Sequence, residues 1–310
     1  MSDAQQLVTT LAAGGGPGEP PGPLAGARYG FEKRPPAAQA RPHAFFTDTS
    51  ICTGCKGCEV ACKQWNQLPV DDVRWGGGYD NTHELSATSW RHVKFVERFP
   101  EAPAAGDAPP LADIEAILAE PKDGDWLIQS DQCKHCADSP CHDACPTGAI
   151  VYTEYGGVFV QPDICVGCSS CVAACPFGVI TRSEIDGHAH KCTMCYDRLR
   201  DGLPPACAQA CTTGAIAFGE HDDMLRQARA RLAQVRARFP LASLYGADAT
   251  PTYTESHSIY LLLGEPRAYG LPDNPVSPRL VHLAGDYLRA AAGLAVAAAI
   301  VLLAVLLAGS

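Results

Sequence analysis

The chain lacks the excess of positive charge that binding to nucleic acid requires. It has 24 Lys and Arg residues against 34 Asp and Glu residues, and its formal net charge is −10 at pH 7. Because phosphate contacts need a basic face, this balance argues against a nucleic-acid partner. A length of 310 residues still leaves room for one large domain or two ordinary ones.

The N-terminal segment lacks the features of a secretory signal. Residues 1–42 are rich in Ala, Gly and Pro and contain neither an apolar h-region nor a twin-Arg pair. Such a composition buries too little apolar surface to offset its ordering entropy, so we predict a disordered tail. If the folded part lies outside the cytoplasm, we expect it to be exported with a partner that carries the signal.

No cysteine remains for nucleophilic catalysis or for a disulfide, because all 16 fall into four runs of four. The runs are Cys52-x2-Cys55-x2-Cys58-x3-Cys62, Cys133-x2-Cys136-x4-Cys141-x3-Cys145, Cys165-x2-Cys168-x2-Cys171-x3-Cys175 and Cys192-x2-Cys195-x11-Cys207-x3-Cys211. In a chain of this length, thiols grouped at ligand spacing indicate metal binding rather than a disulfide scaffold.

The third run, followed by Pro176, has the bacterial ferredoxin pattern, and the second run, followed by Pro146, is similar. In this pattern three close thiolates take three irons of one cubane, and the fourth Cys ligates another cluster. The three-residue gap predicts a helix whose first turn accommodates the Pro. Four runs of four Cys therefore predict four [4Fe–4S] clusters.

Short apolar segments precede three of the runs, and a repeated tail follows three of them. The segments, predicted as strands, are Phe45-Phe46, Trp126-Leu127-Ile128 and Val158-Phe159-Val160. In the tails, Gly148, Gly178 and Gly214 are predicted to be left-handed, and Ile150, Ile180 and Ile216 to return to strands. The repeat predicts an α+β fold with two ferredoxin-like modules over residues 43–219, interrupted by an insertion at 63–125.

The rest of the chain is predicted to surround these modules and to anchor them. Residues 101–124 are predicted as a surface loop with a short helix at 112–119. Residues 220–284 are predicted to contain a helix from Asp222 to about Arg238, a strand at Ser258–Leu263 and an extended arm at Pro266–Pro278.

The C-terminal segment 285–310 is predicted to be a transmembrane helix. Residues 290–308 carry no charge, and their number is just enough to cross a bilayer of about 30 Å. Burial as a docked helix in a larger soluble complex is the alternative. Arg279 and Arg289 precede the span, which by itself favours a cytoplasmic position for the modules.

The residues alone leave two points open. The first is the pairing of the runs: one with two and three with four, or two with three and one with four. The Cys-Pro dipeptide occurs only in runs two and three and favours the second, nested solution. The second point is whether the basic residues beside the motifs offset cluster charge or are solvated. They are Lys56, Lys63, Lys134, Arg182, Lys191 and Arg198.

The four runs resemble those of the iron–sulfur subunits of membrane-bound molybdopterin oxidoreductases, and among these the beta subunits of formate dehydrogenases are the best match. The segments behind that choice are Gln64-Trp65-Asn66, Tyr79-Asp80-Asn81, Leu85-Ser86-Ala87, Ser89-Trp90, Lys134-His135-Cys136-Ala137-Asp138 and Lys191-Cys192-Thr193-Met194-Cys195-Tyr196-Asp197-Arg198. The resemblance covers residues 44–220.

The resemblance implies nested pairing and four ligand sets. The first set is Cys52, Cys55, Cys58 and Cys211, and the second is Cys62, Cys192, Cys195 and Cys207. The third set is Cys133, Cys136, Cys141 and Cys175, and the fourth is Cys145, Cys165, Cys168 and Cys171.

The resemblance also implies a non-catalytic electron-transfer subunit. Its partners would be a molybdopterin (molybdenum or tungsten) subunit that oxidises formate and a membrane cytochrome b or quinone-reactive subunit, with the cluster domain on the extracytoplasmic side of the cell membrane. The corresponding subunit of a dimethyl sulfoxide, polysulfide or nitrite reductase, with reversed electron flow, is the nearest alternative. A membrane-anchored zinc-binding interaction module is the alternative from a different class.

Overall fold

The computed structural model of the chain describes residues 41–70, 79–80, 82, 84–98, 125–277, 285, 287–298 and 300–301. The predicted disordered tail, except residues 41 and 42, and the predicted loop at 101–124 with its short helix lie outside these residues. The elements are β1 (His43–Asp48), α2 (Gly57–Trp65), β2 (Arg91–Arg98), β3 (Asp125–Gln132), α4 (Pro140–Asp143), β4 (Ile150–Tyr152), β5 (Val158–Val160), α5 (Ser170–Ala174), β6 (Thr181–Arg182), β7 (Ala189–His190), α6 (Tyr196–Arg200), α7 (Ala206–Gln209), β8 (Ile216–Glu220), α8 (His221–Val235), β9 (Ser243–Tyr245), β10 (Ser258–Leu262) and the 3-10 helix η2 (Pro266–Tyr269).

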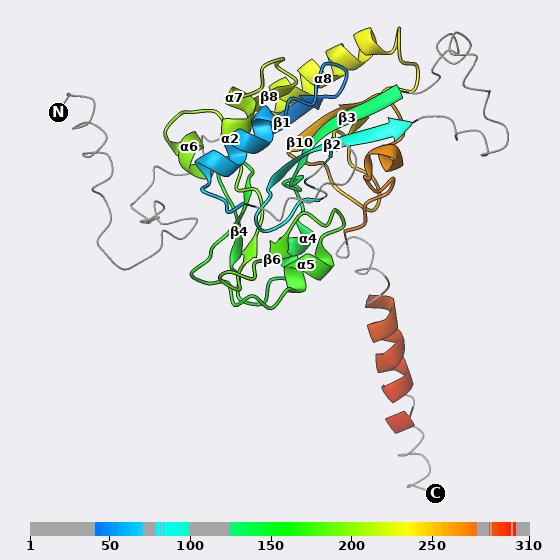
Figure 1. Ribbon diagram of the computed structural model, residues 1–310. Coiled ribbons are helices and arrows are strands. Elements are labelled where there is room, and N and C mark those ends of the chain that lie inside the picture. Colours follow the sequence, from blue (N-terminus) through cyan, green and yellow to red (C-terminus); the bar gives the residue numbers. More distant parts are fainter. Residues whose placement is uncertain are drawn as a thin grey trace, which may run out of the picture. The chain divides into compact units, whose positions relative to one another are not determined.

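A four-stranded sheet in the order β8-β1-β10-β9 joins the beginning of the described chain to its later parts. β1 is antiparallel to β8 and parallel to β10. Side chains alternate along these strands, so Ala44, Phe46 and Ile259 pack toward α8 while Phe45 faces the opposite side. Figure 1 shows α8 lying along this sheet.

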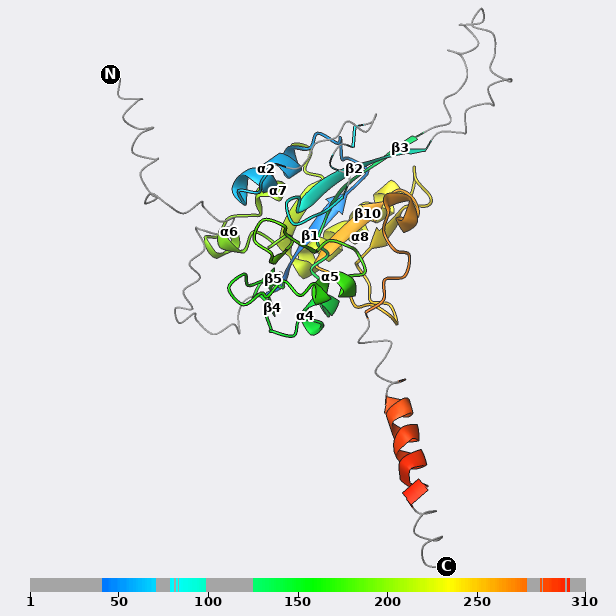
Figure 2. The same ribbon diagram turned by 60° about the horizontal axis from the view of Figure 1, so that its bottom comes forward.

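Three two-stranded sheets complete the described fold: β2-β3, β4-β5 and β6-β7. The second Cys run precedes β4, and the third lies between β5 and β6. The helices of these two runs, α4 and α5, pack against each other. Helix α2 packs on α7, which joins the first run to the fourth. Figures 1 and 2 both place the α2–α7 pair and the α4–α5 pair in different parts of the molecule.

The predicted strands at Phe45-Phe46, Trp126–Ile128 and Val158–Val160 are confirmed as parts of β1, β3 and β5. The glycines of the repeated tails, Gly148, Gly178 and Gly214, have φ values of 69°, 63° and 68°, as predicted. The predicted long helix is α8, which ends at Val235 instead of Arg238. The predicted extended arm begins with the 3-10 helix η2.

The predicted position of the proline in the first turn of a helix is wrong for the second and third Cys runs. Helices α4 and α5 begin at Pro140 and Ser170, so they end before the last Cys of the run. Pro146 instead lies in a turn that the Gly148 N–H closes by donating to the Cys145 carbonyl. The helix occupies the three-residue gap itself, and the proline follows it.

At the C-terminal end, the described residues 287–298 are helical, and their side chains are exposed. Among the residues that the structure describes, no helix is long and apolar enough to cross a membrane. Residues 302–310, which form the second part of the predicted span, lie outside the described residues.

Candidate iron–sulfur cluster sites

The first ligand set is brought together by the pairing of β1 with β8. This pairing joins Thr47 to Ile216 and so places the loop after β1 beside the end of the fourth run. Burial raises the pKa of the Cys52 thiol, and the nearby charges of Cys211 and Cys55 raise it further. Cys58 lies on α2, where its Sγ is 3.1 Å from the hydroxyl of Ser130 on β3.

The second ligand set lies between α2 and the fourth run. Burial raises the pKa of Cys62 well above its usual value, and the charges of Cys192, Cys207 and Cys195 act in the same direction. These are the three partners that the resemblance implies. The backbone N–H of Met194 donates to Cys192 Sγ at 3.4 Å, and such bonds favour the thiolate form.

The third ligand set lines a single cavity. Cys133, Cys136, Cys141 and Cys175 all line it, together with Lys134 and Lys191. Burial raises the pKa of Cys141 to about 12 against the effect of Lys191, and the charges of Cys133 and Cys175 add to the rise.

The fourth ligand set lines a second cavity. Its walls include Cys145, Cys165, Cys168 and Cys171, with the backbone of Gly167 between two of the ligands. Burial raises the pKa of Cys171 to about 11, and the charges of Cys165, Cys145 and Cys168 contribute to that rise.

These donor sets fit [4Fe–4S] clusters. Four thiols per site form the ligand set that such clusters use. The thiols of the third set and those of the fourth set each line one cavity. The loops also wrap tightly, because Lys56 and Ser169, which follow corresponding Cys of the first and third runs, both adopt positive φ. The assignment of each Cys to a cluster stays a prediction.

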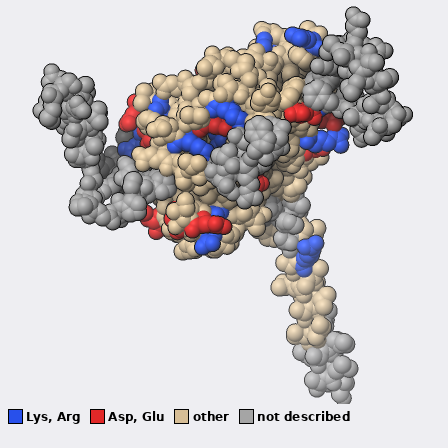
Figure 3. Space-filling view, viewed as in Figure 1, with Lys and Arg blue, Asp and Glu red and all other residues tan. Residues whose placement is uncertain are grey.

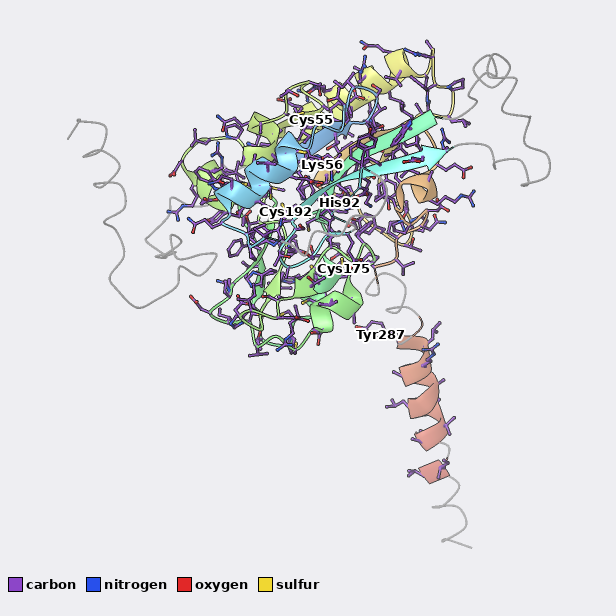
Figure 4. All side chains as sticks on the ribbon, viewed as in Figure 1. Cys55, Lys56, His92, Cys175, Cys192 and Tyr287 are labelled. Atoms are coloured by element: carbon purple, nitrogen blue, oxygen red, sulfur yellow. The ribbon has the colours of Figure 1, made fainter. Side chains whose placement is uncertain are left out.

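The four sets lie in a series. Cys58 of the first set packs in one core cluster with Cys207 of the second. Cys192 of the second set packs with Cys133 of the third, and Cys141 of the third with Cys171 of the fourth. Figure 4 labels Cys55, Cys192 and Cys175, which follow one another from the α2 end toward the α4–α5 end.

The two ends of this series reach the surface. Cys55 of the first set and Cys168 of the fourth are exposed, whereas Cys62, Cys136 and Cys195 of the two middle sets are buried. Large apolar side chains are exposed near both ends. Ile51 and Val60 flank the first set, and Ile164, Val166 and Ile185 flank the fourth.

The basic residues beside the motifs divide into two groups. Lys134, Lys191 and Arg198 are buried, while Arg182 is exposed and Lys56 and Lys63 are partly exposed. Lys191 Nζ donates to the Cys192 carbonyl at 3.1 Å and also to the Val158 carbonyl. In the view of Figure 3, Lys and Arg are interspersed with Asp and Glu and do not form one basic face.

Sequence reasoning missed Arg91, Ser130 and Asp131. All three are buried polar residues on the hairpin β2–β3, and none belongs to a Cys run. Their burial was not visible in the sequence, because it results from packing of the hairpin between α2 and the strand β10.

Gly167 tests whether the loop of the third Cys run, which lines the cavity of the fourth ligand set, needs its observed backbone conformation. Gly167 has φ +66°, and a Cβ there would lie 1.9 Å from the Gly187 carbonyl oxygen. We expect Gly167→Ala to lose the fourth cluster, which is about four irons per chain. Gly178→Ala is the matched control, because Gly178 has φ +63° but nothing within 4 Å of its Cβ position. Iron counting after anaerobic purification distinguishes them, and full iron content in Gly167→Ala would contradict the expectation.

The donor sets and the fold define an iron–sulfur protein of the ferredoxin-like class. Comparisons with known proteins agree. Residues 124–221 match the family model of the 4Fe-4S dicluster domain. The chain is 36% identical over 270 residues to the formate dehydrogenase iron-sulfur subunit of Haemophilus influenzae, covering 84% of this chain and 79% of that protein.

Two further relatives come from Escherichia coli. The iron-sulfur subunit of its nitrate-inducible formate dehydrogenase is 37% identical over 249 residues, 77% of each chain. The B subunit of its anaerobic dimethyl sulfoxide reductase is 32% identical over 217 residues, 68% of this chain and 92% of that protein. The chain belongs to the family of formate dehydrogenase iron–sulfur subunits, and it is an electron-transfer subunit rather than a catalytic one.

Proposed function

We propose that the chain holds four [4Fe–4S] clusters in the four ligand sets given above and connects a formate-oxidising molybdopterin subunit to a membrane cytochrome b or quinone-reactive subunit. The observation that carries this proposal is the packing of four groups of thiols in a series whose first and last members each include an exposed Cys. Bound clusters would supply one-electron redox chemistry.

The residues of the chain also provide burial for the middle sets and a contact surface for a partner at each end. Most ligands of the middle sets are buried, and the exposed Cys55 and Cys168 leave a face for a partner at each end of the series. The apolar side chains at Ile51 and Val60, and at Ile164, Val166 and Ile185, are suited to such contacts. We assign the first set to the catalytic partner and the fourth to the membrane partner.

Membrane attachment through residues 285–310 is part of the proposal. In the described part of this segment the helical side chains Leu288, Leu294 and Val296 are 71%, 78% and 60% exposed. Apolar side chains in such positions favour a lipid or partner environment. The extracytoplasmic side is proposed from the family, against the weak signal of the flanking charges.

Formate-dependent reduction tests the function. In the anaerobically co-purified complex, we expect formate to reduce the clusters, seen as bleaching of their visible absorption and as new EPR signals. Dimethyl sulfoxide should not reoxidise them. Inert formate combined with rapid reoxidation by dimethyl sulfoxide would instead favour the second candidate, which the similarity to the B subunit of the reductase supports. Stoichiometric zinc in place of iron would contradict both.

A further inference from the structure

Arg91 is a buried cation at the start of β2. Arg91 is only 3% exposed. The guanidinium lies over the ring of Phe45, with Cζ 5.4 Å from the ring centre, and its Nη1 donates to the Ser130 hydroxyl at 2.8 Å. Neither contact supplies negative charge.

Within the described part of the chain, no carboxylate pairs with the charge of Arg91. Its main electrostatic neighbours there are cysteines and a tyrosine, and its Nη2 has no hydrogen-bond partner among the described residues. Lys134, which is equally buried, differs because it forms an ion pair with Asp131. A buried charge without a partner is costly, so the environment of Arg91 points to an anion that the protein atoms alone do not provide.

The groups around Arg91 indicate which anion would balance its charge. Cys58 of the first ligand set and Cys207 of the second pack in the same core cluster as Phe45, over whose ring the guanidinium lies, and their charges act on Arg91 more strongly than those of its other neighbours. Against the effect of burial, their charges raise the pKa of Arg91. The guanidinium therefore lies where the first two ligand sets meet.

Ser130 connects Arg91 to one of these ligands. Its Oγ accepts the hydrogen bond from Arg91 and lies 3.1 Å from Cys58 Sγ. Because the oxygen accepts from the guanidinium, the hydroxyl proton is free to be donated to the sulfur. Hydrogen bonds to cluster sulfurs and nearby positive charge both favour the reduced, more negative state.

We propose that Arg91 and Ser130 are positioning residues that raise the reduction potentials of the first two clusters. Arg91 acts on both through its charge, and Ser130 acts on the first through Cys58. Reduction adds one electron and one negative charge without forming or breaking a bond, and the fixed guanidinium charge stabilises that state. This inference rests on the proposed function, because it requires clusters in these sets.

Potentiometric titration followed by EPR tests the inference on the full complex. In Arg91→Met, we expect two of the four midpoint potentials to fall by about 59 mV, which is a tenfold change in a one-electron equilibrium. In Ser130→Ala, only one potential should fall. Arg91→Lys keeps the charge and should shift both potentials less than Arg91→Met. Arg98→Met, at the exposed end of the same strand, is the control and should leave all four unchanged.

Iron counting separates the possible failures. If Arg91→Met does not retain its iron, Arg91→Lys and Ser130→Ala still test the inference, because the first keeps the buried charge and the second removes only a hydroxyl. Unchanged potentials in Ser130→Ala and in an iron-replete Arg91→Met would overturn it. Absence of cluster signals from the unmodified complex would instead overturn the proposed function.

Discussion

Removing the third cluster is expected to disconnect the two ends of the series. The double variant Cys136→Ala/Cys141→Ala takes away two of the four thiols that line the third cavity. We expect it to retain about 12 of 16 irons, at four irons per cluster. Mutation of a residue that supports a metal ligand already lowers metal affinity or activity by about 10–100-fold. Loss of a whole cluster is a larger change, so electron transfer between the two ends should fall by at least that factor.

The physical reason is distance. The third set is the link between Cys192 of the second set and Cys171 of the fourth. Electrons supplied at either end should therefore reach only the clusters on that side, whereas dithionite, a small diffusible reductant, should reduce all that remain. Stopped-flow reduction by formate in the complex measures this difference.

A matched variant controls for disturbed packing. Val179 lines the same cavity without being a ligand and is buried. Val179→Ala should keep its iron and its end-to-end electron transfer. Undiminished transfer in an iron-depleted Cys136→Ala/Cys141→Ala variant would show that the sets do not form one series.

The second large effect is expected at Asp131. This carboxylate is 2% exposed and binds Lys134, Lys94 at 3.0 Å and the Tyr260 hydroxyl at 3.1 Å. Although burial alone would raise it, the charges of Lys134 and Lys94 hold the pKa of Asp131 well below its usual range. Asp131→Asn leaves Lys134 buried without its counter-charge, which costs about 3–5 kcal/mol.

Anaerobic urea unfolding, followed by cluster absorbance, measures this loss as a midpoint lowered by about 1–2 M. The double variant Asp131→Asn/Lys134→Met is the control. Because it removes both charges, it should recover most of the lost stability. A midpoint in Asp131→Asn equal to that of the unmodified protein would mean that the buried pair contributes little.

The local geometry of the Cys runs could be predicted from the sequence because it depends on neighbouring residues. The left-handed turns at Gly148, Gly178 and Gly214 follow from short-range sterics, and the strands β1, β3 and β5 follow from short apolar segments beside the runs. The position of Pro146 was predicted incorrectly because a different proline begins the helix. The helix α4 begins at its own proline, Pro140, so the helix is already complete when the chain reaches Cys145.

The environment of the sites could not be predicted in the same way, because it depends on contacts between distant segments. Arg91 and Cys58 both reach the Ser130 hydroxyl because β2 packs on α2, where Glu59 accepts a hydrogen bond from the Val93 N–H. Ser130 reaches the same place through the pairing of β3 with β2, across which it opposes Val93. No spacing within a Cys run encodes these contacts.

The most direct test of the central claim is the count of iron and acid-labile sulfide per chain after anaerobic purification, combined with low-temperature EPR of the dithionite-reduced protein. Four cubanes predict about 16 irons, about 16 sulfides and a spectrum of coupled clusters. Eight irons or fewer, or stoichiometric zinc without an EPR signal, would contradict the account of four clusters in series.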